Sequence, residues 1–300
     1  MPVMSTGSVL DREEYIEQAY FFRVMRERLT SAVSTQEVLE RIDQEILSTT
    51  RLPYAIQFLA AELKHAGLLS SGFARLPHYF TPYQAFVIQG TEEEGRRFSV
   101  DTALLVLQRE AEYRAGQPTA PGLFVYQFEV LCRNRLGYDD GLTAMAGDPF
   151  YDADWRAYLE FLRGQVGLVD FADLVYVRSE QYVMEQRRQE PGYAPPLPPL
   201  FGEKEGKIAR ANHGKDPLFL FSALQRQLNY PEVPRVRPRD DLAAKLDALQ
   251  ARLRETELRL KLVEAEVRGQ IDLAQFGRPD LLSGGPEIKL GGKDEGEPEQ

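Results

Sequence analysis

The chain of 300 residues has only three histidines, His65, His78 and His213, as candidate metal ligands or proton carriers. His65 follows Glu62 in a Glu-x-x-His pattern, which on a helix places both side chains on one face. Di-iron sites in helical bundles need two such pairs, and neither other histidine has an acidic residue three positions before it. We therefore retain one candidate metal or small-ligand site, formed by Glu62, His65 and His78. The simpler interpretation is a histidine that caps or bridges helices near Gly67.

Two aspartates in an apolar run form a second group of interest. Asp170 and Asp173 lie three positions apart within residues 169–178. On a helix, this spacing brings both carboxylates near one face. We expect them to form a structural ion pair with Arg133 or Arg135 on a neighbouring helix.

The segment 76–83, Leu-Pro-His-Tyr-Phe-Thr-Pro-Tyr, concentrates a histidine and three aromatic residues between two prolines. Such a segment could line a binding pocket. We favour the alternative that it is a rigid loop whose rings fill part of the core.

No catalytic motif stands out, so we expect neither catalytic residues nor a cofactor. Residues 202–207 resemble part of a phosphate-binding loop, but only three residues separate its glycines, and Ile208 stands where a hydroxyl group is required. The single cysteine, Cys132, lies in the apolar run 123–132, which indicates a buried thiol rather than a nucleophile.

The composition narrows the class of protein. Hydrophobic residues make up 43% of the chain and charged residues 27%, which is typical of a folded domain. The 36 basic and 46 acidic residues give a net charge of −10, which argues against a nucleic-acid partner. The sequence contains no basic, apolar signal at its start and no uninterrupted apolar span of membrane length. We therefore expect a cytoplasmic protein without membrane insertion.

Helical periodicity dominates the first 230 residues and predicts an all-α body. Apolar residues recur every three or four positions, with capping residues before several segments and glycine after others. A short strand pair at 85–88 and 98–100 is the less favoured alternative for that stretch. The predicted helices cover residues 11–31, 34–47, 53–67, 99–116, 122–136, 151–163, 168–188, 203–212 and 216–227.

The strongest pattern in the chain is a heptad repeat near its C-terminus. Apolar residues alternate by four and three, as in the seam of a coiled coil. The predicted organisation is an α-helical body over 11–230 with a Pro-rich strap at 191–199, a Pro-rich linker at 231–240, a coiled coil at 241–276 and a disordered acidic tail at 277–300. The seam residues are Leu242, Leu246, Leu249, Leu253, Thr256, Leu260, Val263 and Val267.

Charged residues beside this seam favour parallel helices. In a parallel pair, Arg252 faces Glu257 of the other copy, and Arg259 faces Glu264. An antiparallel pair would place mainly like charges together. In this heptad, leucines such as Leu253 and Leu260 occupy a positions, and the β-branched Thr256 and Val263 occupy d positions. This arrangement does not favour a strict dimer, so the number of copies stays open. The alternative is that this helix folds back onto its own body.

Together these patterns predict a non-catalytic protein that assembles with copies of itself through a parallel coiled coil and recruits an unidentified protein partner. The alternative is a metal- or small-ligand-binding helical protein, or an enzyme, with its site near Glu62, His65 and His78.

Overall fold

The computed structural model describes residues 10–31, 33–93 and 98–235, and a few residues between 249 and 263. Within these residues every regular element is a helix, and extended pairing is limited to two isolated bridges, Val166–Val169 and Ser179–Phe201. The predicted all-α class is therefore confirmed. The chain divides into two units, Met1–Val236 and Arg237–Gln300. The first unit is called the body below.

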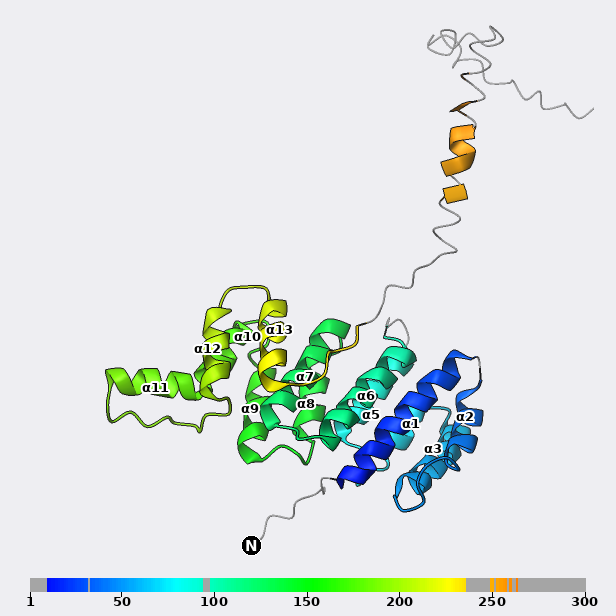
Figure 1. The fold of residues 1–300 in the computed structure, drawn as a ribbon, viewed down its shortest axis with the longest axis horizontal. Coiled ribbons are helices and arrows are strands. Elements are labelled where there is room, and N and C mark those ends of the chain that lie inside the picture. Colours follow the sequence, from blue (N-terminus) through cyan, green and yellow to red (C-terminus); the bar gives the residue numbers. More distant parts are fainter. Residues whose placement is uncertain are drawn as a thin grey trace, which may run out of the picture. The chain divides into compact units, whose positions relative to one another are not determined.

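Thirteen helices form the described part of the body (Figure 1). They are α1 (Arg12–Thr30), α2 (Thr35–Ile42), α3 (Leu52–Ala66), α4 (Leu69–Ala74), α5 (Pro82–Glu92), α6 (Val100–Ala115), α7 (Ala120–Asn134), α8 (Tyr138–Ala146), α9 (Ala153–Arg163), α10 (Phe171–Val177), α11 (Glu180–Gln189), α12 (Glu203–Ala211) and α13 (Pro217–Leu228).

Local sequence signals explain where many of these helices begin. Side-chain oxygens of Ser34, Ser99, Asp152 and Ser179 accept hydrogen bonds from backbone amides in the first turns of α2, α6, α9 and α11. Thr81 forms a complete capping box at the start of α5. These contacts satisfy amides that have no partner within the helix. Proline occupies the first turn of α3, α5, α7 and α13, where its missing amide hydrogen costs nothing.

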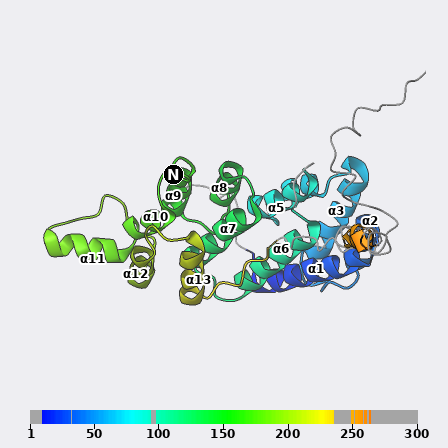
Figure 2. The ribbon, with the colours of Figure 1, turned by 90° about the horizontal axis from the view of Figure 1, so that it is seen from above.

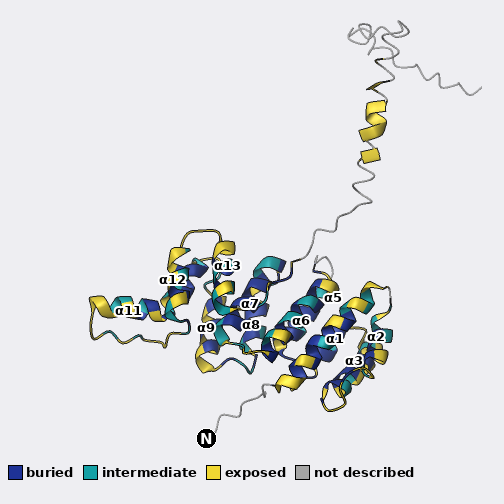
Figure 3. Ribbon diagram, in the orientation of Figure 1, coloured by how far each residue is buried: buried dark blue, intermediate teal, exposed yellow. Residues whose placement is uncertain are grey.

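Helix α7 lies at the centre of the body. All residues from Gly122 to Leu131 are buried, and the helix packs against α6, α8 and α13. Helices α1 and α6 make the most extensive helix–helix contact. Figures 1 and 2 both place α2 and α3 at one end of the body and α11 and α12 at the other. Figure 3 shows that burial is concentrated along the inner faces of these helices.

An aromatic cluster joins α7 to the part of the body formed by α9–α12. The Phe124 ring lies 5.3 Å from Trp155, and the Trp155 ring lies 5.4 Å from Phe201, which precedes α12. Phe128 on the next turn of α7 stacks on Phe171, the first residue of α10, at 4.5 Å. These rings are buried, so they fix the start of α10 against the central helix.

The structure corrects two expectations about secondary structure. The predicted helix over 168–188 is two helices, α10 and α11. They separate at Ser179, which takes an extended conformation, caps α11 and pairs with Phe201. The strand alternative is wrong for 85–88, because these residues lie inside α5. Helices α4, α5 and α8 were not predicted.

The Pro-rich segment 191–199 returns along α11 instead of continuing a helix. The Tyr193 carbonyl accepts a hydrogen bond from Arg187 at 3.3 Å, and the Pro198 carbonyl accepts one from Arg178 at 3.1 Å. Proline forbids helix continuation here. Most of the segment is exposed to solvent, Leu197 included.

Candidate functional site

The aspartates that the sequence singled out lie on α10, but not with the predicted partner. Asp170 is the N-terminal cap of α10, where its Oδ1 accepts from the Ala172 amide at 3.0 Å. The expected pairing with Arg133 or Arg135 is wrong. Arg133 forms its ion pair with Glu129, one turn earlier on α7. Arg135 ends α7 in the left-handed conformation, and no ion pair links it to either aspartate among the described residues.

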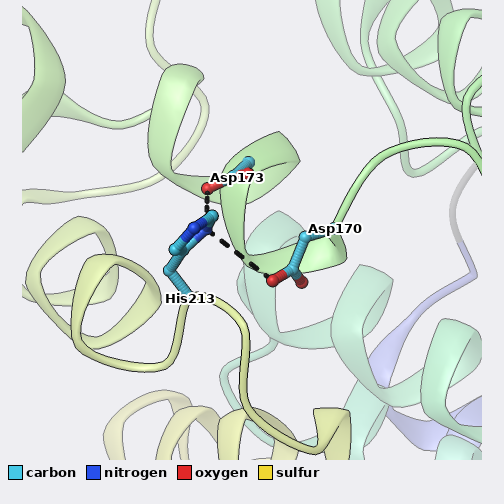
Figure 4. Close-up of side chains that lie close together, drawn as sticks. All are labelled: Asp170, Asp173 and His213. Atoms are coloured by element: carbon cyan, nitrogen blue, oxygen red, sulfur yellow. Dashed lines mark hydrogen bonds and ion pairs between the residues drawn. The ribbon is translucent and has the colours of Figure 1, made fainter.

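Instead, the structure brings His213 to the two aspartates (Figure 4). Its Nδ1 atom lies 2.7 Å from Oδ1 of Asp173 and 3.8 Å from Oδ2 of Asp170. One oxygen of each aspartate and this nitrogen lie within 4.8 Å of one another. The side chains keep 26% (Asp170), 39% (Asp173) and 64% (His213) of their surface exposed, so solvent reaches the cluster.

Two separate segments build this Asp–Asp–His cluster. Two contacts anchor helix α10 to the body. Phe171 stacks on Phe128 of α7, and the Tyr158 hydroxyl donates to the Leu174 carbonyl at 3.1 Å. His213 lies in the turn between α12 and α13. The turn continues at Gly214 with a φ of +68°, a conformation that favours glycine. The Gly214 amide donates to Oδ2 of Asp170 at 2.7 Å, which ties the turn to α10.

The residues of the other predicted site are not brought together into a ligand set within the described residues. Glu62 accepts hydrogen bonds from Ser71 at 3.1 Å and Arg75 at 2.6 Å. The hydrogen bond from Arg75 is the main reason why the pKa of Glu62 lies below its ordinary value. His65 is exposed in the last turn of α3, and His78 is exposed in the loop before α5. Glu62 thus fastens α3 to the end of α4.

The aromatic segment 76–83 contributes to both the core and the surface. Tyr79, Phe80 and Tyr83 are buried, as expected for a loop that fills part of the core. On one side, His78 and Tyr79 line a cavity of about 370 Å³ together with Tyr54 and Phe58 of α3. On the other side, residues of the same segment line a cavity of about 470 Å³ between α4, α5 and α8, whose other lining residues include Phe73, Phe86, Asp140 and Ala144.

Sequence reasoning missed a polar cluster in the interior of the body. Arg114 on α6 donates to Glu110 at 2.8 Å and also pairs with Asp148, and the exposed fraction of all three side chains is 1% or less. Gln127 of α7 donates to the same Glu110 oxygen at 2.7 Å and accepts from the Tyr151 hydroxyl at 2.8 Å. The only sequence signal was an i,i+4 acid–base pair on an otherwise apolar helix face.

Cys132 packs against the core at the end of α7 and is partly buried. Burial raises the pKa of its thiol to about 11. Because the thiolate is the reactive form, this cysteine has the properties of a structural residue.

Part of the heptad seam lies within the described residues, and those residues are helical. Leu249, Leu253, Leu260 and Val263 each keep between 54% and 62% of their surface exposed. The Thr256 hydroxyl donates to a carbonyl of its own helix, that of Arg252 at 3.0 Å or that of Leu253 at 2.9 Å. Its polar group is therefore satisfied before any partner helix arrives. The remaining predicted seam residues, Leu242, Leu246 and Val267, and Glu264 of the predicted interchain pairs, lie outside the described residues.

Comparisons with models of protein families, with curated proteins and with solved structures find no match to this chain. None of the described helices is both long and apolar enough to cross a membrane. The class that the fold defines is an all-α protein.

Proposed function

We propose that this chain is a non-catalytic homo-oligomeric scaffold whose copies associate through the C-terminal heptad segment. The observation that carries the proposal is the row of exposed apolar side chains Leu249, Leu253, Leu260 and Val263 on described helical residues. With Thr256 between Leu253 and Leu260, these positions alternate by four and three, which is the spacing that a partner helix covers in a coiled coil. Burying one such side chain contributes roughly 1.5–3 kcal/mol.

Two polar groups on this segment are bonded within their own helix. Thr256 stands in the seam, but its hydroxyl is bonded to its own backbone. Arg259, which we predict to face Glu264 of another copy, pairs in the single chain with Glu255 of its own helix at 2.7 Å, so the interchain pair would replace this one. Such pairs stabilise a helix by a few tenths of a kcal/mol. In proteins, most of the stability of a helix comes from packing of its apolar face rather than from helix propensity, so association of two or more copies would supply most of the stability of this one.

Removal of the segment tests the proposal. Light scattering after size exclusion would compare the full chain with a chain that ends at Arg239, just after the boundary between the two units. We expect a multiple of the monomer mass for the full chain and the monomer mass for the shortened chain. The same oligomeric state for both proteins would show that the heptad segment does not drive assembly.

The second candidate function is binding of a small ligand beside His78, which is the one residue of the predicted Glu62, His65 and His78 site that lines a cavity. The observation that favours it is the cavity of about 370 Å³ beside His78, whose lining is mostly apolar and aromatic and includes Tyr54, Phe58 and Tyr79. Apolar walls with a few polar groups are typical of small-molecule sites. A thermal-shift screen of the full chain against apolar compounds would test it. A stabilising compound must lose its effect in His78→Ala and keep it in His65→Ala, which alters a histidine that does not line the cavity.

A further inference from the structure

The Asp–Asp–His cluster formed by Asp170, Asp173 and His213 has no role in the proposed assembly. It joins α10 to the turn after α12, forty residues later in the chain. Two carboxylate oxygens and one imidazole nitrogen converge there. This combination of donors is the one that divalent transition-metal ions such as Zn²⁺ and Mn²⁺ accept in proteins.

The spacing of the donors suits such an ion. Ligands that bind Zn²⁺ at about 2.0–2.2 Å lie roughly 3.0–3.5 Å from one another. The two distances from Nδ1 of His213, 2.7 Å to Asp173 and 3.8 Å to Asp170, lie on either side of this range. Each partner would therefore move by less than about 1 Å to reach a common ion.

The charge of the cluster points to a cation as well. Among the described residues, the ion pairs of Asp170 and Asp173 are with His213 alone. Other acidic side chains of the body that form ion pairs have an arginine or lysine partner, as Glu62 has Arg75 and Glu185 has Arg210. When His213 is neutral, the two carboxylates carry two negative charges, and neither forms an ion pair with an arginine or lysine within the described residues. A divalent cation would neutralise both.

Contacts outside the cluster hold one of the three ligands, Asp170, in place before any ion arrives. Asp170 accepts backbone amides on both of its oxygens, from Ala172 and from Gly214. Phe171 and Ala172 are buried, so the start of α10 does not turn freely. Outer contacts of this kind orient metal ligands and raise metal affinity.

We propose that Asp170, Asp173 and His213 form a binding site for a divalent transition-metal ion, with Zn²⁺ as the best match to one nitrogen and two oxygen donors. The remaining coordination positions face solvent and are available to water or to a ligand. The bound ion would link α10 to the turn between α12 and α13. The proposal does not depend on assembly through the heptad segment.

The presence of only three histidines makes a direct test practical. The untagged full chain is treated with a chelator, dialysed and titrated with Zn²⁺, while NMR follows the three imidazole signals. His65→Gln, His78→Gln and His213→Gln assign the signals. We expect the His213 signal to change in a saturable, one-to-one manner while the His65 and His78 signals stay unchanged.

Two variants measure the contribution of the ligands. Calorimetry should show Zn²⁺ binding weakened by at least about 10–100-fold in His213→Gln and in Asp173→Asn, because loss of even an outer contact costs that much. Both side chains are partly exposed, and circular dichroism checks that the variants fold. His65→Gln is the matched control and should bind as the unmodified chain does. Asp170→Asn is less useful, because Asp170 also caps α10.

Either of two results would overturn the proposal. One is no Zn²⁺ binding by the unmodified chain up to about 1 mM, which corresponds to negligible affinity. The other is binding that persists unchanged in both His213→Gln and Asp173→Asn.

Discussion

Arg114 and Glu110 form an ion pair at 2.8 Å in the interior of the body, where the exposed fraction of both side chains is 1% or less. Asp148 pairs with the same guanidinium, so two carboxyl groups share one buried cation. Among the residues that the structure describes, no hydrogen-bond partner reaches the second oxygen of Glu110 or the buried hydroxyl of Tyr83. Burial raises the pKa of Glu110 above the ordinary value of a glutamate. Protonation of this carboxyl would remove the excess negative charge.

Replacement of Glu110 by glutamine should stabilise the body at neutral and alkaline pH. In the unfolded chain, this carboxyl ionises at its ordinary pKa. The stability that the Glu110 carboxyl provides is therefore complete below its unfolded-state pKa, and it is lost as the pH rises through the higher pKa of the folded state. Each pKa unit by which the folded-state value exceeds the unfolded-state value lowers the free energy of unfolding at high pH by about 1.4 kcal/mol. Glu110→Gln keeps the oxygen that Arg114 and Gln127 use and removes the ionisation.

Urea unfolding of Glu110→Gln across the pH range would check this prediction. We expect its free energy of unfolding to match that of the unmodified chain in acid and to exceed it increasingly toward alkaline pH. Glu112→Gln, an exposed change on the same helix, is the control and should leave the pH profile unchanged. A variant less stable than the unmodified chain at pH 8 would show that Glu110 is folded in its ionised form.

Removal of Arg114, the cation that Glu110 and Asp148 share, should destabilise the body. In Arg114→Met, the carboxyl groups of Glu110 and Asp148 lose their buried partner. We expect the free energy of unfolding to fall by about 3–5 kcal/mol, the usual cost of breaking a buried ion pair from one side. Chemical denaturation measures this change. Arg156→Met, on the exposed face of α9, should change stability by less than about 0.5 kcal/mol. Equal effects of the two changes would contradict a structural role for Arg114.

Cys132 should react slowly with thiol reagents in the folded protein. Its pKa of about 11 leaves little thiolate at neutral pH. With Ellman's reagent at pH 7.5, we expect labelling far slower than that of the same chain in denaturant, and faster as the pH approaches 11. Rapid labelling of the native protein at pH 7.5 would indicate an activated thiol and would favour an enzyme.

The orientation of the helices in the proposed coiled coil can be tested by exchanging charges. In a parallel pair, Arg252→Glu places glutamates of the two copies opposite each other at two symmetric positions. Each exposed pair is worth about 0.2–1 kcal/mol, so we expect the loss of two pairs to weaken association by about 2-fold to 30-fold. Adding Glu257→Arg should restore it. Sedimentation equilibrium measures the association constants, and failure of the second change to restore association would argue for another orientation.

The sequence predicted those elements whose signals are local. The segment with Pro53 in its first turn and Gly67 after its last turn is α3, and Ser99 and Gly116 flank α6. Helix α5 was missed because its short apolar run also suits a strand, and its helical state depends on the Thr81 capping box and on burial.

Contacts between distant segments were not predictable in the same way. The spacing of Asp170 and Asp173 indicated a shared face, and both reach His213. Nothing in the sequence connects that histidine, forty residues further on, to α10. Likewise, Arg114 and Glu110 are visible as a helical pair, but their burial beside Asp148 depends on how α6 packs in the body.

The most direct test of the proposed assembly changes the seam in the full chain. Leu253→Asp combined with Leu260→Asp places two charges where a partner helix would lie, and both leucines are about 60% exposed in the single chain. Leu168→Asp, which alters a more exposed leucine of the body, is the matched control. Light scattering should give an oligomer for the unmodified chain and the control, and a monomer for the double variant. An unchanged oligomer in the double variant, or a monomeric unmodified chain at high concentration, would contradict assembly through the heptad segment.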